Sequence, residues 1–229
     1  MKHHISFDLS FKKNTYPGKF IVFEGIDGSG KTTQIEKVKE ALFKKGTKDI
    51  VTTKEPTENI VGELIHKILQ KKVKVEKTSL QYLFCADRAM HLKEVIEPNL
   101  KEGRLVLSDR YFWSSVAYGL QDKGVLDYES LDSMLVLESI LSMYDQFLLP
   151  DLTFYLNVSA ETAFKRLKEK KKLDLYEQKE KLVNIVKGYK LLIDKFPQNF
   201  IVIDGEKSEQ EVTGEILSHL STLSNLRNL

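Results

Sequence analysis

The feature that most constrains this chain is the stretch "FIVFEGIDGSGKTTQ", residues 20–34. An apolar run leads into a glycine-rich turn and then into a helical pattern, so the stretch predicts a strand, a loop and a helix. Residues 25–32, "GIDGSGKT", match the phosphate-binding pattern G-x-x-x-x-G-K-S/T in full. The glycines let backbone N–H groups turn toward phosphate oxygens, and the helix start adds its positive end. We therefore expect a nucleoside triphosphate with Mg²⁺ rather than an accidental Gly-Ser turn, because the strand and helix supply the expected context.

The polar side chains of this region predict the contacts of a phosphoryl-transfer site. Lys31 can reach the terminal phosphates, and the hydroxyl of Thr32 can ligate Mg²⁺. Asp109 follows the apolar run 105–108, where a carboxylate can hold the same ion, and Arg110 can neutralise phosphate oxygens. An Asp-Arg pair is also a common surface ion pair, but its place after a strand favours the site. The residues expected to bind ATP are Gly25, Asp27, Gly28, Ser29, Gly30, Lys31, Thr32 and Thr33.

The rest of the chain alternates strand-like and helix-like segments, which is typical of an α/β fold with a mostly parallel sheet. The expected strands are residues 20–23, 50–53, 105–108, 152–158 and 200–203. Helical patterns follow the glycine loop and Pro56, and others cover residues 131–141 and 160–195, the last interrupted by a charge run at 170–174. The 229 residues suffice for one core, and the absence of a Gly-, Pro- or Ser-rich linker favours one domain over two small ones.

Composition excludes several classes of function. The net charge of +2, from 35 basic and 33 acidic residues, gives no argument for nucleic-acid binding. The single cysteine, Cys85, excludes an internal disulfide and a multi-cysteine metal site, and it fits a reducing cytoplasm. No apolar segment has the length of a membrane span, and residues 1–19 lack the apolar core of a secretory signal. We assign no metal site to His3 and His4.

Four segments together resemble the thymidylate kinases of the P-loop nucleoside monophosphate kinase group. They are "FIVFEGIDGSGKTTQ", "TKEPT", "LFCADRAMH" with "SDRYFWSSVAYG", and "PDLTFYLNVSAETAFKR", in the order the family has them. The resemblance implies a three-layer P-loop kinase fold with a central parallel five-stranded sheet and a helical lid. It covers residues 20–229 as one domain, with the lid at about 166–178, and leaves 1–19 as an N-terminal extension.

The resemblance also implies how the acceptor nucleotide is bound. Phe84 matches the ring that stacks on thymine, although core packing is an equally good reading of the residue alone. Arg88 matches the arginine that donates to a pyrimidine carbonyl, and Tyr118 matches the aromatic residue that crowds out a 2′-hydroxyl. Asp27 matches a carboxylate that contacts the sugar 3′-hydroxyl, and Ser115 falls near the base.

Two departures from the family pattern concern its cations. Lys54 stands where relatives usually carry an arginine that meets the acceptor phosphate, so the charge is kept and the two-pronged contact is lost. The glycine loop contains no arginine, so the lid is expected to supply the catalytic cation, with Lys170 at the position of the family's arginine. The alternative is that Lys170 and the neighbouring Lys168, Lys171 and Lys172 form a solvated charge run. Glu177, in a family Asp-x-x-Glu pattern with Asp174, is expected to contact the acceptor sugar or simply to lie on a helix face.

The resemblance implies an enzyme that transfers the γ-phosphoryl group of ATP to dTMP with Mg²⁺, in the cytoplasm. Family members are commonly homodimers, and the apolar helix at 131–141 is a candidate interface. Two alternatives remain at this point. One is a P-loop kinase with another nucleotide or nucleoside as acceptor. The other is a nucleotide-binding regulator without catalysis, although the chain has no guanine-reading Asn-Lys-x-Asp segment.

Overall fold

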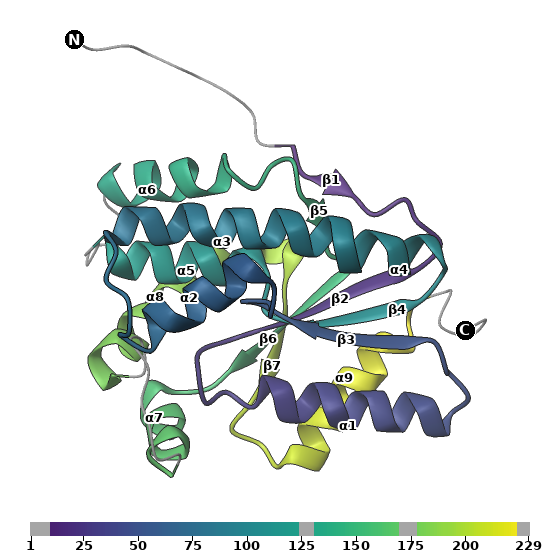
Figure 1. Ribbon diagram of the computed structural model, residues 1–229. Helices are drawn as coiled ribbons and strands as arrows, with labels where there is room; N and C mark the ends of the chain where they lie inside the picture. The colour runs from purple at the N-terminus through teal and green to yellow at the C-terminus, as the bar shows by residue number, and fades with distance from the viewer. Residues whose placement is uncertain (1–9, 124–130, 170–177, 224–229) are drawn as a thin grey trace.

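The computed structural model describes residues 10–123, 131–169 and 178–223. In these residues five parallel strands form the central sheet, in the order β3-β4-β2-β6-β7 (Figure 1). Their bounds are β2 Lys19–Glu24, β3 Ile50–Lys54, β4 Leu105–Asp109, β6 Leu152–Asn157 and β7 Ile201–Asp204. Each predicted strand is thereby confirmed, with ends that differ by a residue or so, and the predicted α/β fold with a parallel five-stranded sheet is confirmed with them.

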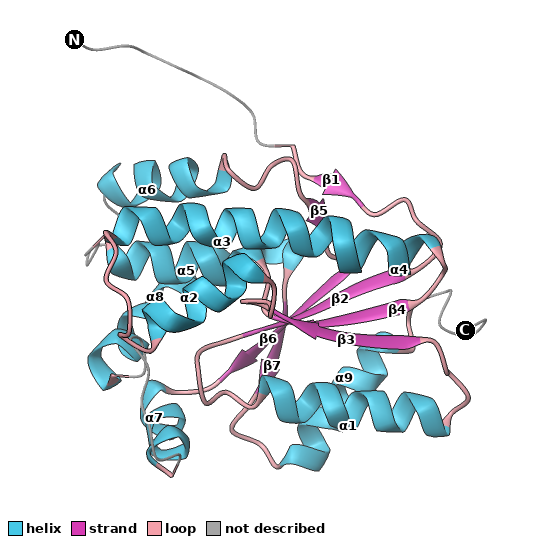
Figure 2. Ribbon diagram, in the orientation of Figure 1, coloured by secondary structure: helices cyan, strands magenta, loops and turns pink. Residues whose placement is uncertain are grey.

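Helices cover both faces of the sheet (Figure 2). One face packs against α1 Lys31–Lys44 and α9 Glu209–Leu220, where Ile35, Val38 and Ile216 are buried. The other face supports a larger core that includes Trp113 and Tyr189. The elements around that core are α2 Ile60–Leu69, α3 Lys77–His91, the π-helical turn Leu92–Ile96, α4 Glu97–Lys101, α5 Phe112–Asp122, α6 Leu131–Leu141 and α8 Lys179–Lys195. Strands covered on both faces explain the nearly continuous apolar runs of the sequence.

The segment before β2 packs on this core. Residues Lys12–Lys13 form β1, which pairs in parallel with β5, Leu148–Leu149. The Phe11 ring stacks on Phe112, with ring centroids 5.5 Å apart, and Asn14 donates to Asp151 over 2.6 Å. Residues 10–19, which the sequence predicts as part of an N-terminal extension, therefore contact this core over much of their length.

The segment that the sequence predicts as a lid is described only at its two ends. Helix α7, Ala160–Lys168, leads into it, and α8 begins after it at Lys179; a 3₁₀ turn, Pro197–Asn199, separates α8 from β7. Residues 170–177 lie outside the described part of the chain. Within the described part, no helix is long and apolar enough to cross a membrane.

Candidate active site

The glycine loop joins β2 to α1 at the carboxyl edge of the sheet, the edge where parallel α/β sheets bind ligands. Gly28 has φ +83°, and a Cβ there would lie 2.6 Å from the carbonyl oxygen of Ala163 on α7. Only glycine fits this position, because a side chain would be both strained and obstructed. Gly30 caps α1 with φ +98° and provides no side-chain cap, so the first N–H groups of the helix remain available to an anion.

Lys31 lies inside the loop, with its ammonium turned toward the strand ends. Its Nζ donates to the carbonyl oxygens of Gly25 and Ile26, both at 3.1 Å, and lies 4.0 Å from Asp109 Oδ1. Burial lowers the pKa of this ammonium, the charge of Arg110 lowers it further, and Asp109 opposes both effects. A phosphate oxygen bound in the loop could take the place of these two carbonyl contacts.

Thr32 and Asp109 form an oxygen-rich pair beside Lys31. The Thr32 hydroxyl donates to Asp109 Oδ2 over 2.6 Å. A hydroxyl and one carboxylate are oxygen ligands of the kind that Mg²⁺ takes when substrate phosphates and waters complete its octahedron. The described residues contain no group of three or more His, Cys, Asp or Glu side chains that could hold a metal ion. The pair therefore fits a magnesium ion that enters with a phosphate ligand, and it does not form a closed protein cage.

Arg110 connects the glycine loop with the next helix. Its backbone is left-handed, with φ +74°, which is uncommon for a residue with a side chain. One guanidinium nitrogen, Nη1, donates to Gly25 O at 3.0 Å and Ser114 Oγ at 2.9 Å, and Nη2 donates to Asp27 Oδ1 at 2.6 Å. Tyr118 donates from its hydroxyl to Asp27 Oδ2 over 2.8 Å and also lies 2.9 Å from Arg110 Nη2. The arginine, aspartate and tyrosine thus form one closed cluster.

The charges of this cluster fix the protonation of Asp27. Burial works to raise the pKa of Asp27, but the positive charges of Arg110 and Lys31 outweigh it and hold this pKa below its ordinary value. Asp27 is therefore an acceptor at neutral pH, as a contact with a sugar hydroxyl requires.

Arg88 lies at the opposite end of the site, buried to 2% exposure. Its Nε donates to Glu55 Oε2 at 2.8 Å, and Nη2 donates to the same oxygen and, at 3.1 Å, to Ser115 Oγ. The guanidinium lies over the rings of Tyr111 and Tyr144, at 5.2 and 4.8 Å from their centroids. Among the described residues, Nη1 has no hydrogen-bond partner, so this buried donor is unsatisfied. A ligand carbonyl would satisfy it.

Glu55 is held from the other side by His91. His91 Nδ1 lies 2.9 Å from Glu55 Oε1, and His91 Nε2 lies 2.6 Å from Thr53 Oγ1. Burial works to raise the pKa of Glu55, but the charges of Arg88 and His91 and their hydrogen bonds outweigh it, so this pKa lies below its ordinary value. Glu55 and His91, which support Arg88 in this way, were not among the residues predicted from the sequence.

A cavity of about 500 Å³ connects the two ends of the site. Phe84 lines it near Arg88, and Lys54 lines it with an exposed side chain whose Nζ lies 2.6 Å from Glu58. His66 and Arg166 also line it, and neither was among the residues predicted from the sequence. Of the predicted residues, the cavity is lined by Asp27, Gly28, Ser29, Gly30, Lys31, Thr32, Thr33, Lys54, Phe84, Arg88, Asp109, Arg110, Ser115 and Tyr118.

Of the three remaining predicted residues, the structure describes only Gly25. Gly25 is not in the cavity wall but accepts from both Lys31 and Arg110 through its carbonyl oxygen. Lys170 and Glu177 lie outside the described residues, so their roles stay predictions. Arg166 donates to the carbonyl oxygens of Gly28 and Gly205, which seats it against the glycine loop.

Comparison with known families supplies the decisive observation: the profile of the family described as thymidylate kinase matches residues 23–216. The chain belongs to the thymidylate kinase family. The resemblance found in the sequence is thereby confirmed. The thymidylate kinase of Thermosipho africanus is 38% identical over 202 residues, which cover 87% of this chain and 96% of that protein.

Relatives from other organisms give the same result. The probable thymidylate kinase of Methanocaldococcus jannaschii is 41% identical over 206 residues, covering 89% of this chain and 96% of that protein. The thymidylate kinase of Buchnera aphidicola is 34% identical over 218 residues, covering 93% of this chain and 99% of that protein. The family match therefore extends over almost the whole length of each thymidylate kinase.

Proposed function

We propose that this chain is an ATP:dTMP phosphotransferase, which uses Mg²⁺ and releases ADP and dTDP. One observation carries the proposal: a single cavity joins the glycine loop to a buried guanidinium with an unsatisfied donor. The first end suits a triphosphate, and the second suits a pyrimidine carbonyl. The relatives described above are named thymidylate kinases or probable thymidylate kinases, which agrees with this assignment.

At the donor end, the proposed contacts follow from the loop and α1. The backbone N–H groups of residues 28–31 and the start of α1 would surround the phosphates, and Lys31 would meet the terminal ones. Thr32 and Asp109 would hold Mg²⁺, which when bound neutralises charge on the phosphate oxygens. Ser29 and Thr33, which also line the cavity, complete the donor side.

At the centre, Arg110 is the proposed catalytic cation. Its guanidinium donates to Gly25 and Asp27 of the glycine loop, so a phosphoryl group passing between the two nucleotides would meet it. The acceptor phosphate attacks in line, and no covalent enzyme intermediate is needed. The protein's contribution is to position the two phosphates and stabilise the charge of the transition state. Lys170 is proposed as a second cation from the lid.

At the acceptor end, Arg88 would donate from Nη1 to a thymine carbonyl while Phe84 stacks on the ring. Tyr118 would pack under the deoxyribose. Its hydroxyl donates to Asp27, which would keep the ring in the position where it excludes a 2′-hydroxyl. Ser115 would lie near the base, Lys54 would meet the acceptor phosphate, and Glu177 is proposed to contact the acceptor sugar.

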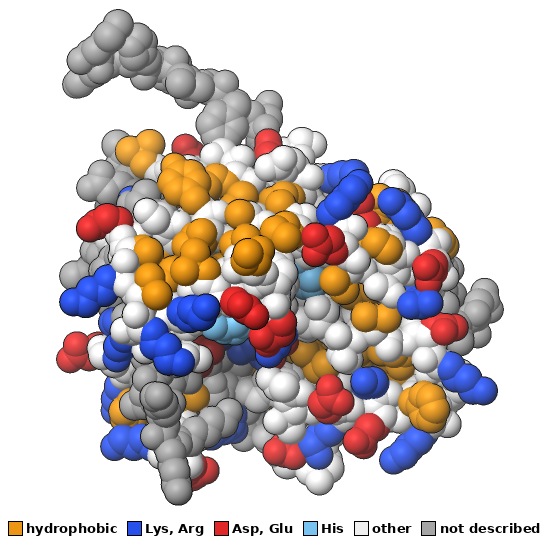
Figure 3. All heavy atoms as spheres, viewed as in Figure 1, with side chains coloured by type: hydrophobic (Ala, Val, Ile, Leu, Met, Phe, Trp, Pro, Cys, Tyr) orange, Lys and Arg blue, Asp and Glu red, His pale blue; other side chains and the backbone are white. Residues whose placement is uncertain are grey.

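We also propose a homodimer in the cytoplasm. Figure 3 shows hydrophobic side chains gathered over α3 and α6. Tyr82 on α3 and Leu135 on α6 are exposed, at 63% and 54%. An apolar surface of this kind is typical of a self-association face. The single cysteine, Cys85, suits a reducing compartment.

The test is a coupled ADP-release assay with Mg·ATP and a panel of acceptors: dTMP, dUMP, UMP, CMP, AMP, GMP and thymidine. We expect the highest kcat/KM with dTMP. A Lys31→Met variant serves as the control for contaminating kinases and should show no turnover above background. Absence of dTDP at saturating dTMP would refute the proposed function. Equal turnover of UMP and dTMP would refute the role of Tyr118.

A further inference from the structure

Glu24 is a buried carboxylate without a role in the chemistry proposed above. It is the last residue of β2, directly before the glycine loop, and its side chain is fully buried. A buried carboxylate is costly unless hydrogen bonds satisfy it, so its partners show what it stabilises. Burial raises the pKa of Glu24, whereas hydrogen bonds from Ser114 and Tyr189 and the charge of Arg110 work against that rise.

One oxygen of Glu24 binds the start of α5. Tyr111 N donates to Oε1 at 3.0 Å, and Ser114 N donates to the same oxygen at 3.2 Å. Helix α5 has no side-chain cap from its own N-cap residue, Tyr111. Glu24 therefore takes the place of the missing cap from a strand that lies far away in sequence, and its negative charge faces the positive end of the helix.

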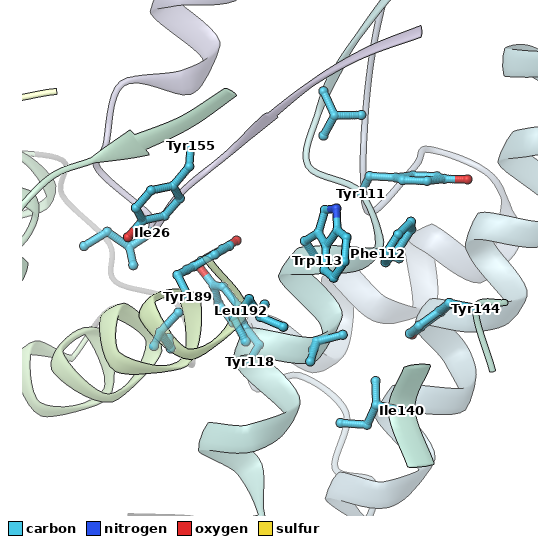
Figure 4. Packing of buried hydrophobic residues seen from close by; sticks show 14 of the residues in the cluster. Ile26, Tyr111, Phe112, Trp113, Tyr118, Ile140, Tyr144, Tyr155, Tyr189 and Leu192 are labelled. Carbon is cyan, nitrogen blue, oxygen red and sulfur yellow. The ribbon is translucent and has the colours of Figure 1, made fainter. Parts of the chain in front are cut away.

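The other oxygen of Glu24 connects α5 with α8. Ser114 Oγ and Tyr189 OH both donate to Oε2, the latter over 2.8 Å, and the two hydroxyls lie 2.8 Å from each other. Ser114 Oγ in turn accepts from Arg110 Nη1. Figure 4 shows Tyr189 within the core near Tyr155, and the centroids of these two rings lie 4.9 Å apart. The ring packing fixes the hydroxyl of Tyr189 where it reaches the carboxylate.

The left-handed backbone of Arg110 explains why such support is needed. Arg110 immediately precedes Tyr111, whose N–H is bound by Glu24, and a non-glycine residue keeps a φ of +74° only where its surroundings hold it. The chain on the other side of Arg110 is held by the sheet, since Arg110 N donates to Phe23 O at 2.9 Å. Phe23 and Glu24 are adjacent in β2, so the same strand end holds both sides of the turn.

We propose that Glu24 is a positioning residue for phosphoryl transfer, which sets the orientation of Arg110 by holding the first turn of α5, and that Tyr189 couples α8 to the same carboxylate. The inference rests on the proposed function for its kinetic part. It assigns Glu24 no contact with substrate. Its effect passes through Ser114 and the backbone of Tyr111 to the guanidinium.

The test uses Glu24→Gln, Tyr189→Phe and the double variant in the full chain. Gln keeps the shape and one carbonyl oxygen for the two N–H groups, but it replaces the oxygen that accepts from the two hydroxyls. We expect kcat to fall roughly 10-fold or more in Glu24→Gln and about 3-fold in Tyr189→Phe, with KM for ATP changed less than about 2-fold. Because both changes act on one network, the double variant should be no slower than Glu24→Gln.

Two measurements separate positioning from general destabilisation. Ile216→Val, in the core between the sheet and α9, is the matched control that lowers Tm without touching the network, and its kcat should equal that of the wild type. Hydrogen–deuterium exchange of residues 110–118 reads the turn directly and needs no turnover. We expect this exchange to be faster in both single variants, while the exchange of α9 is unchanged.

The outcomes are distinguishable. Unchanged kcat and unchanged exchange of residues 110–118 in Glu24→Gln would overturn the inference, as would losses that multiply in the double variant. If Glu24→Gln does not fold, Tyr189→Phe alone decides, because it removes one hydroxyl only. A wild type that makes no dTDP would refute the proposed function, and the exchange experiment would still decide the role of Glu24.

Discussion

Replacing Arg88 with methionine should damage both folding and acceptor binding, and a second change separates the two effects. Arg88 and Glu55 are exposed by only 2% and 4% of their side-chain surface. Removing one partner of such a buried pair leaves the other charge uncompensated, which costs about 3–5 kcal/mol of the free energy of unfolding. We expect Arg88→Met to show this loss in urea denaturation at pH 7.

The loss in catalysis has a different origin and size. If Arg88 Nη1 donates to a thymine carbonyl, its removal costs a charged hydrogen bond of about 1.5–3 kcal/mol. That free energy corresponds to a roughly 10- to 150-fold lower kcat/KM for dTMP. KM for ATP should stay within about 2-fold of the wild type, because the glycine loop is untouched. The assay is ADP release with dTMP varied at saturating Mg·ATP, below the Tm of the variant.

The double variant Arg88→Met, Glu55→Gln distinguishes the two roles. Removing both charges of a buried pair is often nearly neutral for stability, so most of the lost free energy of unfolding should return. The kcat/KM for dTMP should not return, because the donor to the base is still missing. Recovery of both quantities together would refute the reasoning, since Arg88 would then act on folding alone. Wild-type kcat/KM in the single variant would refute it equally.

Three further changes test other parts of the site. Gly28→Ala should lower Tm and abolish most turnover, because the backbone here is left-handed and the added Cβ would meet the carbonyl oxygen of Ala163. Calorimetry measures the Tm and the ADP-release assay measures the turnover. Wild-type values for both would contradict this prediction. The pKa of Glu55 is lowered on folding, so its contribution to stability is present above about pH 4.5 and is lost as the pH falls through the lower pKa of the folded state. Below about pH 4.5, the Tm of the wild type should therefore fall more steeply than the Tm of Glu55→Gln. Parallel curves of Tm against pH would count against the assignment. Glu58→Gln should release Lys54 for the acceptor phosphate and lower KM for dTMP by about 2- to 5-fold. Tm should stay unchanged, because an exposed ion pair contributes at most about 1 kcal/mol. A higher KM for dTMP would show that Glu58 helps to orient the lysine instead.

Local sequence patterns predicted the parts of the site that local structure builds. The glycine loop is a contiguous motif, and the placement of Asp109 and Arg110 follows from the apolar strand before them. The family resemblance identified Phe84, Arg88, Ser115 and Tyr118, and the structure brings all four to one cavity. Their common location could be anticipated because each depends on residues close together in the sequence or on a motif shared with relatives, and their roles stay predictions.

The supporting residues could not be predicted in this way. Glu24 is an acidic residue at the end of an apolar run, and the partners that bury it come from 87 to 165 positions further along the chain. His91 ends a helix that is ordinary in sequence, yet its ring lies buried beside Glu55. Two-residue strands such as β1 are too short to produce a periodic pattern. Tertiary packing determines the placement of Glu24, His91 and β1, and local patterns in a single sequence do not predict that packing.

The turn between β4 and α5 has a consequence for the length of the acceptor. Its three consecutive residues each belong to a different part of the site: Asp109 binds Thr32, Arg110 binds Asp27, and the Tyr111 ring lies under Arg88. In the proposed function, this turn sets the spacing between the proposed magnesium pair and the phosphoryl path, and the ring contact of Tyr111 relates that spacing to Arg88. An acceptor shorter by one phosphate would then have to bridge a spacing that this turn sets. Thymidine bound at Arg88 would leave its 5′-hydroxyl a full phosphate away from the reacting position, so the rigidity of this turn would itself distinguish nucleotides from nucleosides.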